Sequence, residues 1–246
     1  TNSAWISIAL FGSLPFLLSD IEMSFVDAFF ESTSGITTTG ATVIENLETK
    51  SRGILIWRAL LQWLGGVGII VMALAVLPML SIGGMQLFKT ESYETPDKVV
   101  PKAASFAAGI SIVYITLTVM WVFMLWGAGM PIFDSIAHAM TTLATGGYST
   151  KSESLAAFNS STIEIIIIFG MLVGSLPFVH YLTLSKNGLK NLIKDDQVKL
   201  FLTLVLFVVL VMSLYLSFNN LPYLEALRLA SFNVISIITG TGFGTS

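Results

Sequence analysis

The sequence predicts an all-α integral membrane protein made of tandem repeats, each with a helix, a short re-entrant pore loop and a second helix. Of its 246 residues, 54% are hydrophobic and only 11% are charged, with a mean hydropathy of +0.82. Soluble domains carry about 25% charged residues. Apolar segments long enough to cross a bilayer recur along the chain. Between them, one short pattern occurs three times, which indicates an internal repeat.

The repeated pattern is an acid, then a short and mildly apolar segment, then a cluster of Thr and Gly. Its copies are residues 27–43 (DAFFESTSGITTTGATV), 134–150 (DSIAHAMTTLATGGYST) and 225–246 (EALRLASFNVISIITGTGFGTS). Asp27 and Asp134 each lie 13 residues before a glycine of the cluster, Gly40 and Gly147. The third copy fits less closely, because Glu225 lies 17 residues before Gly242.

The order of apolar and polar segments predicts the organisation of the whole chain. A first span at residues 4–18 is short for a bilayer crossing of about 20 residues, and we expect its beginning to be missing. The predicted parts are repeat 1 at 1–80 (pore helix and filter 27–43, inner helix 54–80), a linker at 81–102, repeat 2 at 103–184 (filter 144–150), a linker at 185–199, and part of repeat 3 at 200–246 (filter 239–245).

The three Thr/Gly clusters are predicted to be pore loops. Each follows a helical segment of roughly 10–13 residues, which crosses only about half a bilayer. Non-helical backbone at membrane depth is tolerated where protein buries it or where it lines a watery cavity. Glycine backbone and threonine hydroxyls suit a cation site made of oxygens, as in the filter of potassium channels. The candidate filter residues are Thr38, Thr39, Gly40, Thr145, Gly146, Gly147, Gly240, Thr241 and Gly242.

Acids and lysines predict which way the loops face. Asp27, Asp134 and Glu225 precede the short helices, where the positive end of a helix dipole favours an acid. Seven lysines in the two linkers, against three basic residues in the opposite loops, place the linkers in the cytoplasm. The loops would then enter from outside, below an acidic vestibule that concentrates cations. The linker lysines 186, 190, 194 and 199 either mark topology alone or form a docking strip for a partner or for lipid.

The chain resembles the TrkH/KtrB/HKT superfamily of potassium transporters, and its TrkH branch most closely. The stretches that carry the resemblance are TSGITTTGAT, LATGGYST, ITGTGFGTS, QWLGGVGIIVMALAVLPML and GMLVGSLPFVHYL. The resemblance implies four joined repeats around one pore, with one filter glycine per loop at Gly40, Gly147 and Gly242. Gly146 remains an alternative to Gly147. The second half of repeat 3 and the whole of repeat 4 are absent from the sequence, so we expect no selectivity from this part alone.

The same resemblance implies a substrate and partners. It implies potassium ions as substrate with no cofactor, membrane lipid around a multi-pass protein of the bacterial inner membrane, a homodimer, a cytosolic nucleotide-binding regulatory subunit, and no nucleic acid. One alternative is a sodium- or proton-coupled secondary transporter with broken helices at the midplane, which predicts inverted repeats. A sodium preference is a further alternative, against which Gly40 argues by resemblance. No enzyme is expected. An enzyme would need a nucleophile with a base, and Ser175 and His180 are the only Ser/His pair close together on one span. Ser175 lies outside a Gly-x-Ser-x-Gly setting.

Several residues inside the apolar segments carry expectations of their own. Glu31 is expected to be a buried acid bonded behind the filter, and Arg58 to extend toward the interface. His138 and His180 are each either a hydrogen-bonded interior residue or a proton relay. Gly65, Gly66 and Gly68 suggest close helix packing or a hinge, and Pro177 a packing kink or a gate. Two His and no Cys argue against a structural zinc site.

Overall fold

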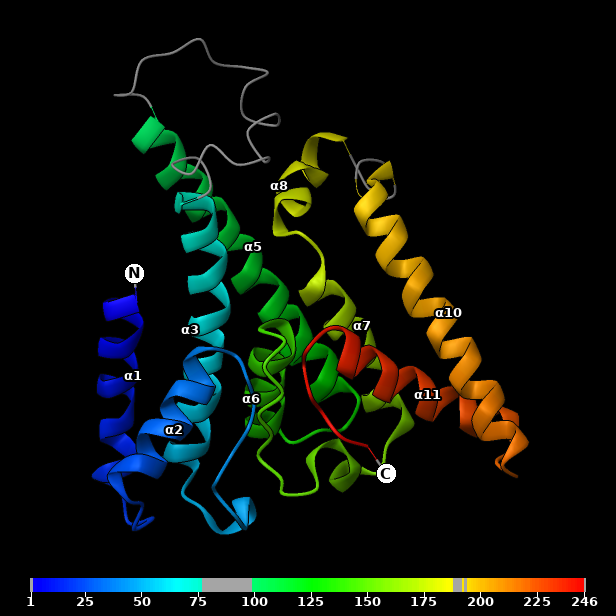
Figure 1. The fold of residues 1–246 in the computed structure, drawn as a ribbon, viewed down its shortest axis with the longest axis horizontal. Coiled ribbons are helices and arrows are strands. Elements are labelled where there is room, and N and C mark those ends of the chain that lie inside the picture. The colour runs from blue at the N-terminus through cyan, green and yellow to red at the C-terminus, as the bar shows by residue number, and fades with distance from the viewer. Residues whose placement is uncertain (1, 77–98, 188–191, 193, 246) are drawn as a thin grey trace.

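The computed structural model describes residues 2–76, 99–187, 192 and 194–245, and regular structure in these residues is helical throughout (Figure 1). In chain order the elements are α1 (Asn2–Leu17), α2 (Phe25–Ile36), η1 (Leu47–Thr49), α3 (Arg52–Val76), α5 (Val99–Gly127), α6 (Ile132–Leu143), η3 (Ser154–Phe158), α7 (Ser161–Ser175), α8 (Phe178–Asn187), α10 (Asp196–Phe218) and α11 (Tyr223–Ile238). Most of the linker predicted at 81–102, and part of the one at 185–199, lie outside the described residues.

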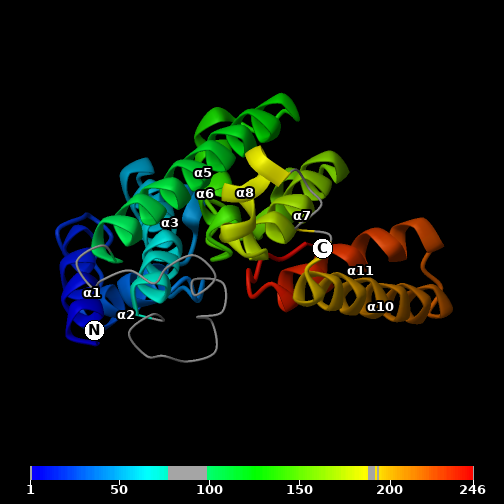
Figure 2. The same cartoon turned by 90° about the horizontal axis from the view of Figure 1, so that it is seen from above.

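The helices pack as three successive copies of one arrangement. In each copy an outer helix packs against a short pore helix, in the pairs α1 with α2, α5 with α6, and α10 with α11. The inner helix that follows packs between two pore helices, its own and the next one along the chain. Thus α3 contacts both α2 and α6, and α7 contacts both α6 and α11 (Figures 1 and 2).

The pore helices explain why the third copy of the sequence pattern fitted less closely. Asp27, Asp134 and Glu225 are each the third residue of their helix. The helices α2 and α6 have 12 residues, whereas α11 has 16. One additional turn of α11 therefore accounts for the longer distance from Glu225 to its glycine, and both ends of the three helices correspond.

Two described helices are long and apolar enough to cross a membrane, Ala107–Gly127 and Asp196–Phe218. The shorter apolar helices include Ser3–Leu17 and Ser161–Ser175. The last part of repeat 2 is divided into α7 and α8 at Leu176, which has an extended backbone, and Pro177. A residue that precedes proline is driven toward extended backbone, which explains why the helix is interrupted at Pro177.

Close packing, rather than a hinge, explains the glycines in the middle of α3. A Cβ on Gly65 would overlap with the carbonyl oxygen of Ile36, at the end of α2. A Cβ on Gly66 would lie 2.9 Å from the Tyr114 hydroxyl and 3.1 Å from the Cα of Ala144, at the end of α6. These two glycines therefore let α3 lie directly against the C-terminal ends of two pore helices.

We predict that Asp195 stabilises the beginning of α10. Its carboxylate accepts hydrogen bonds from the backbone N–H groups of Val198 (3.1 Å) and Gln197 (2.8 Å), and these bonds hold its pKa below the ordinary value. Asp195→Ala should lower the free energy of unfolding by about 1 kcal/mol at pH 7. Because the pKa is depressed, this contribution exists above the ordinary value of 3.8 and is lost as the pH falls.

Thermal unfolding in detergent at pH 7 and in the acid range measures this effect. Asp196→Ala is the matched control, since the neighbouring carboxylate is 95% exposed and pairs only with Lys199 among the described residues. An equal loss in the two variants would contradict the assignment of Asp195 as the helix cap.

Candidate functional site

The three Thr/Gly loops have the same backbone conformation. In each, two residues separated by one position have a positive φ: Thr38 and Gly40 (55° and 81°), Thr145 and Gly147 (49° and 76°), and Gly240 and Gly242 (74° and 80°). The residue before each pair ends its pore helix with a helical or near-helical φ. The pore helices therefore all lead into one type of turn, and their C-terminal carbonyls, which carry the negative end of the helix dipole, are directed toward the loops.

Neighbouring loops are in direct backbone contact. A Cβ on Gly40 would overlap with the carbonyl oxygen of Gly146, and a Cβ on Gly147 would overlap with the carbonyl oxygen of Thr241. Gly146 and Thr241 precede the second positive-φ residue of their own loops. The last glycine of one loop thus packs against the same carbonyl position of the next loop, from loop 1 to loop 2 and from loop 2 to loop 3. A Cβ on Gly242 would meet nothing within 4 Å.

This pattern also decides which glycine of loop 2 corresponds to Gly40. Gly147 matches Gly40 in φ and in its contact with the next loop. Gly146 has no positive φ, and its carbonyl accepts a hydrogen bond of 2.6 Å from Nε2 of Gln62. The sequence placed Gly146 among the filter residues, but its carbonyl is bonded to a side chain of α3.

Loops 1 and 3 are held by their own hydroxyl groups. The hydroxyls of Thr37 and Thr39 are 2.8 Å apart, and those of Thr239 and Thr241 are 2.7 Å apart. In addition, a serine of the pore helix donates to the carbonyl of the residue after the last glycine. These bonds are Ser34 to Ala41 (2.5 Å) and Ser236 to Phe243 (2.8 Å).

Behind loop 1 lies a buried ion pair. Glu31 of α2 and Arg58 of α3 are 0% and 1% exposed, and Nε of Arg58 is 2.7 Å from Oε1 of Glu31. The Glu31 carboxylate also accepts hydrogen bonds from the Thr42 hydroxyl (2.9 Å) and the Val43 backbone N–H (3.0 Å). The expectation of a buried Glu31 is confirmed. The expectation that Arg58 extends to the interface is wrong, because its charge is neutralised by Glu31 inside the protein.

Arg58 also connects loop 1 to loop 2 by hydrogen bonds. Its Nη2 donates to the Thr42 hydroxyl (3.0 Å), and its Nη1 donates to the carbonyl of Ser149 (3.0 Å). Its guanidinium also lies 4.1 Å from the centre of the Tyr148 ring. The Tyr148 hydroxyl donates to the Glu31 carbonyl at 2.9 Å, so loop 2 reaches back to the first repeat.

One turn further along α3, Gln62 bonds to both sides of Gly147. Besides its bond to the Gly146 carbonyl, its Oε1 accepts a hydrogen bond of 3.0 Å from the Tyr148 backbone N–H. Gln62 is 0% exposed. Sequence reasoning missed this residue. The signal was an amide side chain inside an apolar span, four positions after Arg58 and therefore on the same face of the helix, where two polar side chains need buried hydrogen-bond partners.

Two polar residues of α6, His138 and Asp134, bond to the end of loop 2. His138 is fully buried; its Nε2 is 2.9 Å from the Ser149 hydroxyl and its Nδ1 is 2.8 Å from the Asp134 carbonyl, which confirms a hydrogen-bonded interior residue. Asp134 accepts a hydrogen bond from Thr150 at 2.6 Å and is buried. In contrast, Asp27 and Glu225 are exposed, so the three acids at the helix starts do not have the same surroundings.

The third loop is linked to repeat 2 through Glu164 of α7. Its carboxylate is 2.7 Å from Nη1 of Arg228 and accepts a hydrogen bond of 2.8 Å from the Thr245 hydroxyl. Both inner helices therefore connect to the loop of the following repeat, although with residues of opposite charge.

Comparisons with known proteins identify the family. Residues 1–243 match the TrkH family, described as a cation transport protein. The chain belongs to the TrkH family. It is similar to the Trk system potassium uptake protein TrkI of Halomonas elongata (38% identical, 100% of this chain and 50% of the relative) and to TrkH of Salmonella typhimurium (40% identical, 98% of this chain and 51% of the relative).

A solved structure agrees with the fold. The crystal structure of the potassium transporter TrkH from Vibrio parahaemolyticus matches with a TM-score of 0.88 at 37% identity, over 98% of this chain and 50% of that one. The all-α fold of a TrkH-type membrane transporter is thereby confirmed. The chain spans about half the length of these relatives.

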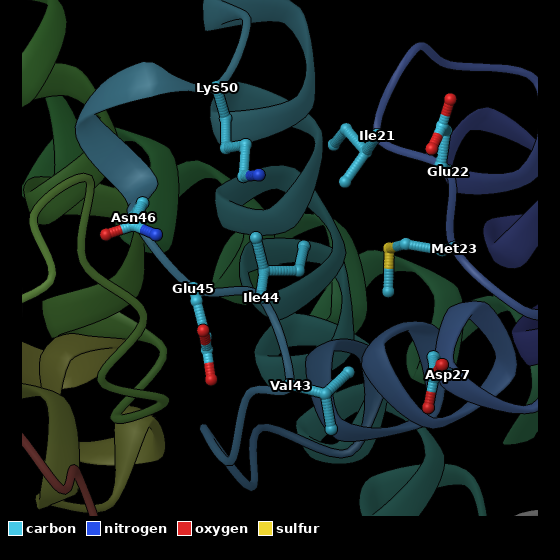
Figure 3. A pocket seen from close by; sticks show the side chains of 9 residues that line it. All are labelled: Ile21, Glu22, Met23, Asp27, Val43, Ile44, Glu45, Asn46 and Lys50. Atoms are coloured by element: carbon cyan, nitrogen blue, oxygen red, sulfur yellow. The ribbon is translucent and has the colours of Figure 1, made fainter.

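Outside the loops, the described residues of this TrkH-family chain form a pocket of about 300 Å³. The pocket lies between the α1–α2 turn and the segment after loop 1, and Lys50 and Met23 reach into it from opposite sides (Figure 3). Three acids line it, Glu22, Asp27 and Glu45, and no candidate filter residue does. Nearby, hydrogen bonds from the backbone and hydroxyl of Ser152 hold the pKa of Glu48 below its ordinary value, so this acid stays ionised.

We predict that the contact between loops makes Gly147 far less replaceable than a glycine with similar φ elsewhere. Gly147→Ala should destabilise the protein more than Gly129→Ala does, because only the first adds an overlap with a backbone carbonyl. Gly129 has a φ of 95° and no atom within 4 Å of a built Cβ. Left-handed backbone alone costs roughly 1–2 kcal/mol in both variants, and overpacking adds roughly 1–3 kcal/mol at Gly147.

The midpoints of thermal unfolding in detergent compare the two variants with the wild type. Equal shifts for Gly147→Ala and Gly129→Ala would show that the loops do not touch as described.

Proposed function

We propose that the protein carrying this chain takes up potassium ions across the cell membrane through a filter of backbone carbonyls, to which these three loops contribute. The substrate is the potassium ion, and no cofactor takes part. The candidate ion ligands are the carbonyls and hydroxyls at residues 38–40, 145, 147 and 240–242. The relatives' names, which refer to potassium uptake in a Trk system, support the choice of ion.

The observation that carries this proposal is the convergence of the three loops. Gly40 packs against Gly146, and Gly147 packs against Thr241, although about 100 residues separate neighbouring loops in sequence. Each loop follows the C-terminal end of a pore helix, where the dipole favours a cation. A set of oxygens at that place replaces the hydration shell of a monovalent ion.

The repeat direction favours this reading over a secondary transporter with inverted repeats. In all three copies the outer helix, the pore helix and the positive-φ loop follow in the same order, and the inner helix follows in the two copies that include it. Inverted repeats would reverse that order relative to the membrane in one half. An enzyme is disfavoured because the Ser175 hydroxyl donates to the Leu172 carbonyl and His180 bonds to Asp195.

The bacterial inner membrane, a homodimer and a cytosolic nucleotide-binding regulatory subunit belong to the same proposal. They are supported by the family resemblance and by the Trk system names of the relatives. The lysines at 186, 194 and 199 lie near the junction of α8 and α10, on the side proposed to be cytoplasmic, and Lys199 pairs with Asp196 at 2.9 Å. Lys190 lies outside the described residues.

We predict that Gly40→Ser lowers the preference for potassium over sodium. The added side chain would overlap with the Gly146 carbonyl and displace loop 1 from loop 2, with an effect of about tenfold in the ion ratio, or about 1.4 kcal/mol. Uptake of rubidium and sodium by a potassium-uptake-deficient bacterium that expresses the full-length protein measures the ratio. Gly129→Ser is the control, and an unchanged ratio in Gly40→Ser argues against the filter.

The orientation has a separate test. This chain contains no cysteine, so a cysteine introduced at Asn187, in a full-length protein without other cysteines, reports the side of the membrane on which α8 ends. We expect an impermeant thiol reagent to label Glu153→Cys from outside intact cells, and Asn187→Cys only after the membrane is opened. Labelling of Asn187→Cys from outside would reverse the topology and the direction in which the filter faces.

A further inference from the structure

Loop 2 lacks the internal hydroxyl bonds that hold loops 1 and 3. Ala144 and Gly146 stand where the other loops have their paired threonines. Thr141 stands at the position of Ser34 and Ser236, but its hydroxyl donates to the Ala137 carbonyl of its own helix at 3.1 Å. Loop 2 nevertheless has the same pair of positive φ values as the others. Its backbone turn bonds to Thr141 and Thr142 match those of the other loops, but the side-chain bonds around its filter glycine come from another helix.

Two residues of α3 bond to loop 2 where loops 1 and 3 have bonds between their own side chains. Gln62 bonds to Gly146 and Tyr148, the two residues that flank Gly147. Arg58, one turn earlier on the same face of α3, donates to the Ser149 carbonyl. The peptide groups on both sides of the filter glycine of repeat 2, and the peptide group after Ser149, are thus bonded to the inner helix of repeat 1.

The same arginine fixes loop 1. Through Glu31 and Thr42 it is bonded to the segment that follows Gly40. The guanidinium is planar and rigid, so its donors hold Thr42 and Ser149 at a set separation. Arg58 and Gln62 are almost completely buried.

We propose that Arg58 and Gln62 form a clamp that sets the position of loop 2 relative to loop 1 and thereby the ion preference, as positioning residues that do not touch the ion. The proposal rests on the proposed function of the loops as a cation filter. It follows that the position of the filter glycine of loop 2 depends on α3 in addition to the bonds within repeat 2. Ion selection of this kind requires ligands placed within about 0.5 Å, which is the role of groups that hold the ligand backbone from behind.

The experiment compares Gln62→Met with Thr118→Val in the full-length protein. Methionine has nearly the length of glutamine but no amide, so the Gly146 carbonyl and the Tyr148 N–H lose their partner. Thr118→Val is a matched control, because it removes a buried hydrogen bond that Trp63 of α3 makes at 3.0 Å, next to Gln62 but away from any loop. The readout is the ratio of rubidium to sodium uptake, which a loss of folded protein alone does not change.

We expect Gln62→Met to lower this ratio about tenfold or more, and Thr118→Val to leave it within about twofold of the wild type. Arg58→Lys is the second variant and remains decisive if Gln62→Met fails to fold. Lysine keeps the charge beside Glu31 but lacks the two Nη groups that bond to both loops. We therefore expect a similar loss of the preference for rubidium over sodium.

The other outcomes overturn the proposal. An unchanged ratio in a folded Gln62→Met or Arg58→Lys variant, or an equal loss in Thr118→Val, would show that α3 has no particular role in selection. A wild type without any potassium preference would instead remove the proposed function itself, and the clamp with it.

Discussion

The structure depends on backbone contact between neighbouring loops. Gly40 lies against the Gly146 carbonyl and Gly147 against the Thr241 carbonyl, at a distance that leaves no room for a Cβ. Three loops that are distant in sequence come together only because their pore helices end side by side. That arrangement in turn requires inner helices that can pack closely between the pore helices. Gly65 and Gly66 allow this, because a side chain at either position of α3 would collide with the neighbouring helices. The glycines of the loops and those of α3 therefore satisfy one steric constraint.

The repeats were predictable from the sequence because they rest on local signals. An acid at a helix start, an apolar segment of set length and a Thr/Gly turn are each encoded within about 17 residues, so the pore helices were found close to their observed bounds. The break at Pro177 is local in the same sense. The extra turn of α11 was not recognised, since its helical pattern runs without interruption from Glu225 to Ile238 and only the structure shows where it corresponds to the others.

The clamp was not predictable, because it joins residues from different repeats. Arg58 near the end of an apolar span has the sequence pattern of a residue that extends to the interface, and only its partner Glu31, 27 residues earlier, keeps it inside. Gln62 bonds to residues 84 and 86 positions later. No periodicity or composition within α3 reports such partners. In loop 2 the 13-residue spacing from Asp134 favoured Gly147 over Gly146, and its φ, its contact with Thr241 and the bond from Gln62 to Gly146 agree with that choice.

The ion pair of Arg58 and Glu31 is better understood as a device for position than for stability. Removing two charges from water opposes the attraction between them, so a buried pair adds little stability relative to apolar residues of similar size. Here the pair has additional hydrogen bonds, and each goes to backbone or hydroxyl groups that follow the filter glycines. Breaking it would leave a buried charge alone, which is strongly unfavourable. The two loops are consequently confined to one separation, and α3, which contacts the ends of both pore helices as well, cannot shift without moving both loops together.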